Sequence, residues 1–427
     1  MVDTHTRARL PRATAALALA LALAASSAAA ETYTFDQAIE LAERTNPALQ
    51  SAQAALRAAE GEKTESDAPL RNNPELSGEH RWRTTPVPGL ADEKVREWQL
   101  GIAQTFEIAG QQGYRRQAAE AALAEAKENV EAVRRRILAE VEQRFFKLLA
   151  LQERLALEQR SLELIENAAR LTQRRVAAGE DSRLAGNLAR VEAERARNQI
   201  AMLEEQLIDA RSELAATLQL PQGVAPQAVG DLSTPPPAYT LRELLDAATQ
   251  RPDLRVLGHR ERAARGRLSL ERASVYPDIT VGLFTERESS NTSRERINGL
   301  SLSIPLPLFR RNEAGIGRAT TELTQVEIER RRALRDARAE VSALWSKLQS
   351  LRTRVDRLAG SVLPSLDENQ RLSAKAYEAG EIGLVELLLV NRQTLDARRE
   401  LLEAEAELRL VQAELARAAG IPSLSGR

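Results

Sequence analysis

Apolar residues recur along this chain with the period of coiled-coil helices. A less regular seam comes first, at Ala126, Val130, Val133, Ile137, Val141, Phe145 and Leu148. No proline interrupts residues 117–176, so this helix is expected to reach roughly 90 Å. In a second long helix, which Pro364 is expected to kink, the apolar spacing alternates between three and four, as in left-handed coiled coils. Its seam is Leu334, Ala337, Val341, Leu344, Leu348, Leu351, Val355, Leu358 and Val362.

Other stretches alternate with the period of two that is typical of strands. Apolar and small or polar residues alternate over 98–106, 279–284 and 300–306, whereas 75–83 is weaker, with only Leu76 and Trp82 strongly apolar. One apolar face and one small polar face are typical of a barrel wall between lipid and water. A soluble sheet packed on the helices is the alternative. The residues expected to face lipid are Trp98, Leu100, Ile102, Ile279, Val281, Leu283, Leu300, Leu302 and Ile304.

The plan of helix, two strands, long helix and helix occurs twice. The start Tyr33-Thr34-Phe35-Asp36-Gln37 returns as Tyr239-Thr240-Leu241-Arg242-Glu243, and both are capping boxes that begin a helix. Ala178-Gly179-Glu180 returns, in the same order along the chain, as Ala379-Gly380-Glu381. We therefore expect a first repeat over 31–220, a linker rich in Pro and Gly over 221–238, and a second repeat over 239–427.

Residues 1–30 have the composition of a secretory signal peptide. Arg7, Arg9 and Arg12 precede an apolar run over residues 13–25, and Ala28-Ala29-Ala30 fits a small-residue cleavage site. The apolar run is too short to span a bilayer. Export from the cytoplasm is therefore expected.

Composition argues against several classes of chemistry. The chain has no cysteine, which removes disulfides and thiolate sites, and His80, His259 and Met202 are too far apart in sequence for a local metal site. The 60 Lys and Arg nearly balance the 61 Asp and Glu, so no charge excess favours nucleic acid. No nucleophile–base pair or phosphate loop is found. We predict no enzyme activity, no metal and no cofactor.

The four strands would leave two open edges, which lipid does not tolerate. Two copies of the chain would give eight strands with a filled interior, whereas three give twelve strands with room for a water-filled bore. The same three chains would supply twelve long helices, enough to close a second barrel. Strand geometry therefore favours a homotrimer over a dimer, without excluding larger rings.

Three motifs resemble those of the TolC-type outer membrane efflux proteins, over nearly all of the mature length. Residues 376–388, AYEAGEIGLVELL, resemble the tyrosine, glycine and leucine pattern of the family's hairpin tip. Residues 302–313, LSIPLPLFRRNE, and 104–113, QTFEIAGQQG, resemble the strand exits of the cobalt–zinc–cadmium resistance branch. The resemblance implies a mainly α duct with a long periplasmic α-barrel and a twelve-stranded β-barrel in the Gram-negative outer membrane.

The resemblance also implies a function and partners. The chain is expected to be the outer-membrane channel subunit of a tripartite efflux system, passing divalent heavy-metal cations passively to the exterior. Its expected partners are two further copies, a periplasmic adaptor, and an inner-membrane pump of the resistance–nodulation–division type. The adaptor would contact the hairpin tips at Gly179, Glu180, Asp181, Ser182, Gly380, Glu381, Ile382, Gly383 and Leu384.

Two further positions are implied at the periplasmic entrance. Glu386 matches an acidic ring that favours cations, although a second acidic position of that ring falls on Leu389. The alternative for Glu386 is a solvated helix carboxylate. Tyr377 matches a latch tyrosine, but its expected partner position is Ala185, and Asp181 or Arg183 would have to substitute.

Other functions remain open at this stage. A multidrug duct or a type I secretion duct would need the same architecture. A soluble periplasmic coiled-coil adaptor or scaffold would explain the export signal and the heptads. It would not explain two copies of the plan, each with its own pair of alternating strands.

Overall fold

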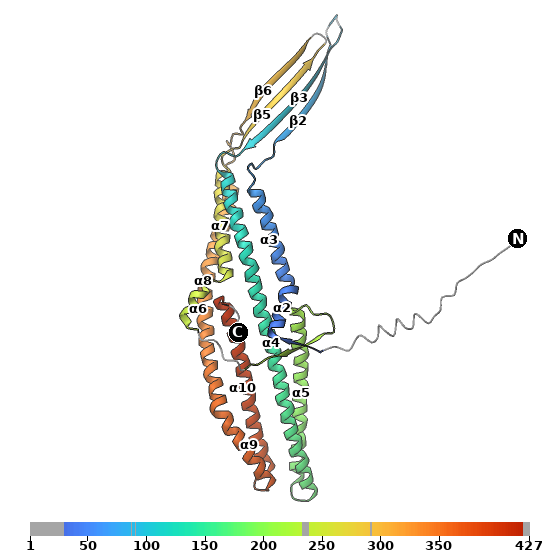
Figure 1. Cartoon of the computed structure of the whole chain (residues 1–427), viewed down its shortest axis with the longest axis vertical. Coiled ribbons are helices and arrows are strands. Elements are labelled where there is room, and N and C mark those ends of the chain that lie inside the picture. Colours follow the sequence, from blue (N-terminus) through green and yellow to red (C-terminus); the bar gives the residue numbers. More distant parts are fainter. Residues whose placement is uncertain (1–29, 87, 90, 233–238, 291–292, 422–427) are drawn as a thin grey trace, which may run out of the picture. The chain divides into compact units, whose positions relative to one another are not determined.

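The computed structural model describes residues 30–86, 88–89, 91–232, 239–290 and 293–421, so residues 1–29 of the predicted signal peptide lie outside the described residues. The chain is mainly helical and forms two compact units (Figure 1). The first takes the described residues up to Pro47, with Arg134–Leu245 and the described residues from Glu340 onward. The second takes Ala48–Val133 and Asp246–Ala339. Within the described residues, no helix is both long enough and apolar enough to cross a membrane.

The first unit combines helices with a short parallel strand pair, in which β1 (Ala30–Thr34) pairs with β4 (Ala225–Val229). Strand β4 lies within the segment predicted as a linker, and its partner β1 stands at the start of the first repeat. The helices are α2 (Phe35–Thr45), α5 (Arg183–Thr217), α9 (Leu363–Glu378), α10 (Leu384–Ala419), the N-terminal part of α6 (Leu241–Ala248), and the C-terminal parts of α4 (Gln111–Ala177) and α8 (Glu313–Arg357).

Aromatic rings and one buried ion pair mark the packing of this unit. The ring of Phe35 lies 5.6 Å from that of Phe145 and 5.4 Å from that of Phe146. Burying a ring of this size stabilises the fold by about 1.5–3 kcal/mol. Glu158 on α4 is 2% exposed and accepts two hydrogen bonds, of 2.5 and 2.6 Å, from Arg399 on α10. The pair therefore ties the two hairpins of long helices together.

The second unit carries a four-stranded antiparallel sheet in the order β2-β3-β5-β6 (Figure 1). The strands are β2 (Glu75–Thr85), β3 (Glu93–Phe106), β5 (Ile279–Ser289) and β6 (Arg294–Ser303). Helices α3 (Pro47–Ser66) and α7 (Pro252–Ala273) lead into the sheet, and α4 and α8 lead out of it. All four strands therefore join helices at one end, the helix end, and hairpins at the other, the hairpin end. Strands β2 and β6 are the edges.

Helix packing in the second unit depends on small residues and ion pairs. A Cβ atom at Gly266 on α7 would lie 3.0 Å from the backbone of Ala118 on α4, so glycine allows the two helices to approach closely. Leu254 and Leu257 pack against Ala337. Ion pairs around these contacts link Arg260 with Glu125 at 2.8 Å, Arg255 with Glu128 at 2.9 Å and Arg267 with Glu322 at 2.5 Å.

Strand register sorts the side chains of the sheet onto two faces, because directly paired residues share a face. In one row Leu76 pairs with Ile102, Ile102 with Leu283, and Leu283 with Leu300. We call this the leucine face. It carries all the residues expected to face lipid except Ile304. The opposite face holds glycines and serines, and there Phe284 lies over Gly299, whose missing side chain leaves room for the ring.

The predicted elements are largely confirmed, with one difference in the second repeat. The long helix is interrupted as expected: α8 passes through a π-helical turn (Leu358–Val362) immediately before Pro364. Proline has no N–H to continue the helical bonding, and π turns accommodate such breaks. Strand β6, however, ends at Ser303, so Ile304 lies just after it. The prediction that Ile304 is a lipid-facing strand residue is thereby corrected. Pro305 cannot donate to a sheet ladder, which is a physical reason for this early end.

Candidate functional site: hairpin tips and sheet faces

The two turns between long helices, residues 178–182 and 379–383, are called here the first tip and the second tip. The second residue of each is a glycine in the left-handed region, Gly179 with φ +78° and Gly380 with φ +77°. The N–H groups of Glu180 and Glu381 bond back to carbonyls of the preceding helical turn at 2.9 and 2.8 Å. This is how a helix end closes, and glycine adopts the required backbone at little cost.

Tyr377 joins the two hairpins through its hydroxyl, close to their tips. The residue is 2% exposed, and its Oη lies 2.9 Å from Oγ1 of Thr172, which is fully buried on α4. Thr172 donates its own proton to the carbonyl of Ala168 at 2.8 Å, so the Tyr377 hydroxyl is the donor of the shared bond. The partner of Tyr377 is therefore Thr172. Neither Asp181 nor Arg183, the candidates from sequence, bonds to this hydroxyl.

Asp181 reaches Tyr377 indirectly, through Arg175. The Arg175 guanidinium lies 5.5 Å from the centroid of the Tyr377 ring, which is a cation–π distance. Its Nε lies 2.9 Å from the carboxylate of Asp181. One arginine thus connects the first tip with the tyrosine of the second hairpin.

Exposure divides the predicted adaptor-contact residues into two groups. Leu384 is 4% exposed and packs with Tyr377, Leu387, Ala168 and Ala189. Its prediction as an exposed contact residue is therefore corrected, because the first residue of α10 points into the protomer. Ile382 packs against the same cluster and is half-buried. Asp181 is also half-buried, and the remaining predicted contact residues are exposed: Gly179, Glu180, Ser182, Gly380, Glu381 and Gly383.

Glu386 has a structural role besides the one predicted for it. Its Oε2 accepts a hydrogen bond of 2.6 Å from the backbone N–H of Gly383, which satisfies one free donor at the start of α10. The side chain remains exposed. A carboxylate held in this way has its position fixed and keeps its charge in contact with solvent. Of the other predicted site residues, this hydrogen bond reaches only Gly383.

A groove of about 540 Å³ lies between the two hairpins of the first unit. Its walls come from α4, α5, α9 and α10, and they combine leucine side chains with the arginines Arg195, Arg392 and Arg398. Leu164, Val385 and Leu389 expose about half or more of their surface there. The groove is thus amphipathic, a surface that fits an amphipathic helix better than it fits a small ion.

Three charged residues of the same unit, Arg409, Glu405 and Glu153, lie near enough to Asp231 to interact with it electrostatically. Burial lowers the pKa of Arg409, which is 4% exposed and lies 5.3 Å over the ring of Phe146. Burial, followed by repulsion from Asp231, raises the pKa of the Glu405 carboxyl. Burial also raises the pKa of Glu153, with repulsion from Glu405 and Asp231 as the smaller causes. These carboxylates are therefore held at a cost in the folded state.

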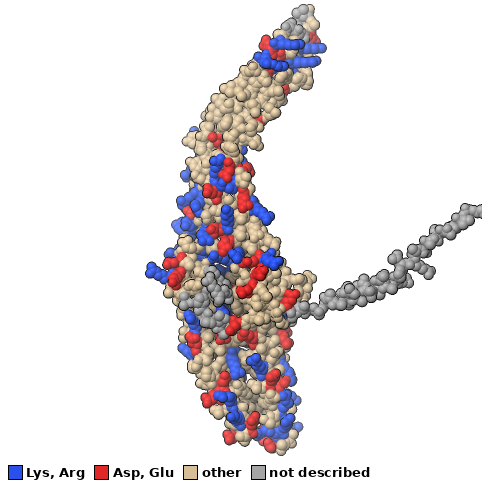
Figure 2. Space-filling model, in the orientation of Figure 1, with Lys and Arg blue, Asp and Glu red and all other residues tan. Residues whose placement is uncertain are grey.

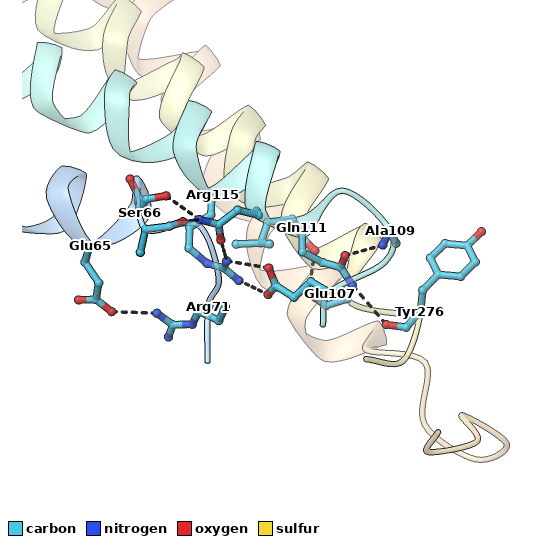
Figure 3. Close-up of polar contacts among 12 residues, drawn as sticks. Glu65, Ser66, Arg71, Glu107, Ala109, Gln111, Arg115 and Tyr276 are labelled. Atoms are coloured by element: carbon cyan, nitrogen blue, oxygen red, sulfur yellow. Dashed lines mark hydrogen bonds and ion pairs between the residues drawn. The ribbon is translucent and has the colours of Figure 1, made fainter. Parts of the chain in front are cut away.

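A polar network fixes the junction between β3 and α4 (Figure 3). Arg115 on α4 donates two hydrogen bonds, of 2.5 and 2.9 Å, to the carboxylate of Glu107. Gln111 accepts from the N–H of Ala109 at 2.7 Å and donates to the carbonyl of Tyr276 at 3.5 Å. The chain turns there at Gly110, with φ +79°. The motif that resembles the branch's strand exit is therefore a rigid corner between strand and helix.

The face opposite the leucine face carries acid, and we call it the acidic face. All the acidic residues of the four strands lie on it, and their charge exceeds that of Arg81 and Arg83, the only strand bases there. Arg83 lies 3.2 Å from Glu97 and 3.6 Å from Glu288. Most of these charges gather toward the hairpin end, where Figure 2 shows the charged side chains of the sheet. The acids are Glu75, Glu79, Glu93, Glu97, Glu286, Glu288 and Glu295.

Sequence reasoning missed the acidic face although the signal was present. Two predicted strands stopped short of charged residues. The one in β3 began at Trp98, just after Glu97, and the one in β5 ended at Phe284, two residues before Glu286. The alternation continues through these charges, because Glu97 keeps the parity opposite to Trp98 and Glu286 the parity opposite to Leu283. Extending each strand by its parity would have found the face. Within the described residues, no group of three or more His, Cys, Asp or Glu is arranged to hold a metal ion.

Comparison with known proteins gives consistent matches in sequence and in fold. The family model "Outer membrane efflux protein" matches residues 38–218 and 244–421. The cobalt-zinc-cadmium resistance protein CzcC of Cupriavidus metallidurans is 27% identical over 366 residues, 86% of this chain and 84% of that protein. The crystal structure of CusC superposes with a TM-score of 0.73 at 21% identity, over 91% of this chain and 92% of that one. VceC of Vibrio cholerae gives a TM-score of 0.74 at 18% identity, over 90% and 96%.

Proposed function

Because this chain belongs to the outer membrane efflux protein family, we propose that it is the outer-membrane channel subunit of a tripartite efflux system that conducts divalent heavy-metal cations passively to the exterior. The TolC-type resemblance and the mainly helical fold agree with the matched family and structures. The family match favours a channel over a soluble adaptor and over an enzyme.

The open edges of the sheet support assembly as a homotrimer. Strands β2 and β6 each have one unpaired edge within the described chain. A lipid environment requires those backbone groups to be bonded, so the edges need partners from further copies. Three copies give twelve strands and a bore wide enough for water. The leucine face then contacts lipid, and the acidic face lines the bore.

The acidic face is the observation that supports a cation as cargo. Carboxylates on one wall of a narrow pore attract cations and repel anions, because the low-dielectric wall focuses the field. Each protomer places seven strand acids there against two arginines. Glu386 would add an acidic ring at the periplasmic entrance. The name of the relative CzcC, a cobalt-zinc-cadmium resistance protein, supports divalent metals as the cations.

The tips and the groove between the hairpins are the surfaces proposed for a periplasmic adaptor. The exposed tip residues Gly179, Glu180, Ser182, Gly380 and Glu381 are open to contact. The amphipathic groove would take an amphipathic helix of that partner. The adaptor would in turn connect the channel to a pump of the resistance–nodulation–division type in the inner membrane.

Tyr377 is proposed as a latch that holds the resting entrance narrow. Its bond to Thr172 and its contact with Arg175 join the second hairpin to the first. The contact between Arg175 and Asp181 extends the same restraint to the first tip. Opening the entrance would separate the hairpins and would have to break these contacts.

Ion selectivity in a planar bilayer tests the proposal most directly. The purified protein is first checked for a trimeric mass in detergent and for its presence in the outer-membrane fraction. Glu286→Gln with Glu288→Gln should then reduce the cation-to-anion permeability ratio to roughly half, because two wall charges per protomer are lost. Glu386→Gln should shift the reversal potential in the same direction while keeping the helix cap, since glutamine also caps.

The matched control changes bases on the other face of the same sheet. Arg96→Gln with Arg296→Gln should leave the reversal potential unchanged, since the leucine face lies outside the bore. A soluble monomer would contradict the proposal. So would a channel whose ion selectivity is unchanged both by Glu286→Gln with Glu288→Gln and by Glu386→Gln.

A further inference from the structure

The leucine face changes character toward the hairpin end. Its rows near the helix end carry apolar residues, such as Ile279 beside Phe106 and Leu302 beside Val281. From the row of Trp98 onward the same face carries bases. They are His80, Lys94, Arg96, Arg287, Arg294 and Arg296, and we call them the basic belt.

Acid is absent from the leucine face along the described strands, because every strand glutamate lies on the opposite face. The six belt side chains are all exposed. Among the described residues, no ion pair engages Lys94, Arg96, Arg294 or Arg296, whereas Arg81 and Arg83 on the acidic face are both paired. The bases of this surface have no acid on their own face of the sheet and are open to an anion from outside the chain.

Two tryptophans share the rows of the belt. The Arg287 guanidinium lies 5.4 Å from the ring of Trp98, and the ring of His80 packs edge-on against Trp82 at 4.2 Å. Trp82 is 73% exposed. Tryptophan prefers the boundary between hydrocarbon and headgroups, so these rings indicate the level at which the belt lies.

Strand geometry gives the same level. Eight residues separate Phe106 from Trp98, which is about 27 Å along a strand that rises 3.4 Å per residue. At a barrel tilt of about 40° this covers roughly 21 Å, close to the apolar band of outer-membrane barrels. With the Phe106 row at one boundary, the row of Trp98 and Arg287 lies at the other. The belt therefore starts where hydrocarbon ends and headgroups begin.

Building on the proposed function, in which the leucine face contacts lipid and the hairpin end faces the exterior, we propose that the basic belt binds the phosphate groups of an anionic glycolipid in the outer leaflet. Phosphate carries the negative charge that is absent from this face of the sheet, and arginine binds phosphate through paired hydrogen bonds. Belt residues from all four strands lie on adjacent rows, so one headgroup with two phosphates can bridge neighbouring strands. Binding of this lipid would anchor the barrel at a fixed depth.

Native mass spectrometry of the detergent-solubilised trimer tests this with two lipids. One is the phosphorylated glycolipid from the outer leaflet, and the other is the same glycolipid with its phosphates removed. The wild-type channel should bind the phosphorylated lipid at least tenfold more tightly, and this preference should weaken with added salt. Equal affinity for the two lipids would overturn the proposal without the use of any variant.

Variants then locate the binding surface. Arg96→Gln with Arg296→Gln should weaken binding of the phosphorylated lipid by roughly tenfold or more. Arg81→Gln with Arg83→Gln removes the same number of arginines from the acidic face of the same sheet and should leave binding unchanged. Equal losses in the two variants would also overturn the proposal. Conductance and outer-membrane fractionation of the wild type are measured in parallel, so a conducting trimer without lipid preference would reject only this inference.

Discussion

At the tips, single side chains hold the two hairpins through contacts between distant parts of the chain. Tyr377 and Thr172 are 205 residues apart in sequence, yet their hydroxyls lie 2.9 Å apart. A buried hydroxyl that loses its partner costs more than the bond itself is worth. Thr172 is protected from this cost, because it keeps its bond to the carbonyl of Ala168. Separating the pair therefore leaves Thr172 bonded, and the cost of a lost partner falls on the Tyr377 hydroxyl.

The first prediction concerns the latch. Tyr377→Phe removes one buried hydrogen bond, worth about 0.5–1.5 kcal/mol, and keeps the ring that packs against Arg175. We expect the open probability of the resting channel to rise severalfold in single-channel recordings. Tyr239→Phe, an exposed tyrosine elsewhere, serves as the control and should change nothing. An unchanged open probability in the Tyr377 variant would show that this bond does not restrain the entrance.

The second prediction concerns the raised pKa of Glu405. A carboxyl whose folded pKa lies above its unfolded pKa binds more protons in the folded state, so stability falls as pH rises through that window. Glu405→Gln should therefore raise the unfolding midpoint at pH 7 by roughly 1 °C, since the group is only half-buried. This gain in unfolding midpoint should vanish at pH values below the unfolded-state pKa of Glu405, because the carboxyl is then protonated in both the folded and the unfolded state.

Thermal unfolding in detergent between pH 4 and pH 8 measures this difference. Glu400→Gln removes an exposed carboxylate on the same helix, and as the control it should leave the unfolding midpoint unchanged. If Glu405→Gln is less stable than the wild type at pH 7, the carboxylate must make a favourable contact whose free energy exceeds the cost of its burial.

At the scale of elements, two glycine turns and one π-helical turn shape the long helices. Gly179 and Gly380 end α4 and α9 by the same backbone geometry in the two repeats. The π-helical turn before Pro364 occurs only in the second long helix, since α4 runs uninterrupted from Gln111 to Ala177. The two hairpins are therefore alike at their tips and differ along their length.

The third prediction addresses the tip geometry. Gly380→Ala places a side chain in the left-handed region, which costs about 1–2 kcal/mol. We expect faster hydrogen exchange at the amides of residues 380–386, including the N–H of Glu381 that bonds to Ala376. Gly317→Ala, in open space on α8, is the control and should be neutral or stabilising. Unchanged exchange at the tip would mean that the turn tolerates alanine and that the glycine serves another purpose.

At the scale of the whole molecule, charge is separated by strand parity. Acids lie on one face of the sheet and bases on the other, and in the proposed trimer the two faces would meet different surroundings. The same four strands would thus set both the preference for cations in the bore and the contact with anionic lipid outside it. Neither property requires a metal site or a cofactor within the protein.

The fourth prediction concerns cargo. A strain that lacks this chain should be more sensitive to zinc, cobalt or cadmium, because a pump without an outer duct cannot clear these cations. Growth inhibition is measured with and without a plasmid that carries the wild-type chain or the Glu286→Gln, Glu288→Gln variant, which should restore tolerance only in part. Normal metal tolerance with raised drug sensitivity would instead favour a multidrug duct.

Local patterns in the sequence determined the elements. The capping boxes at Thr34 and Thr240 form with Gln37 and Glu243 as predicted, since the two residues of each box are only three positions apart in sequence. Heptad seams, glycine turns and strand alternation are likewise local, so they could be found without knowledge of the fold. Family membership followed from motifs of the same local kind.

Tertiary structure decided what depends on residues far apart in sequence. The partner of Tyr377 and the burial of Leu384 require the two hairpins to lie side by side, and the pairing of β1 with β4 joins two segments that are far apart in sequence. Alternation within one strand sorts its own side chains, but only the register between β2, β3, β5 and β6 aligns four such patterns into one acidic face and one basic belt. Periodicity is a property of a segment, whereas a surface exists only after segments pair.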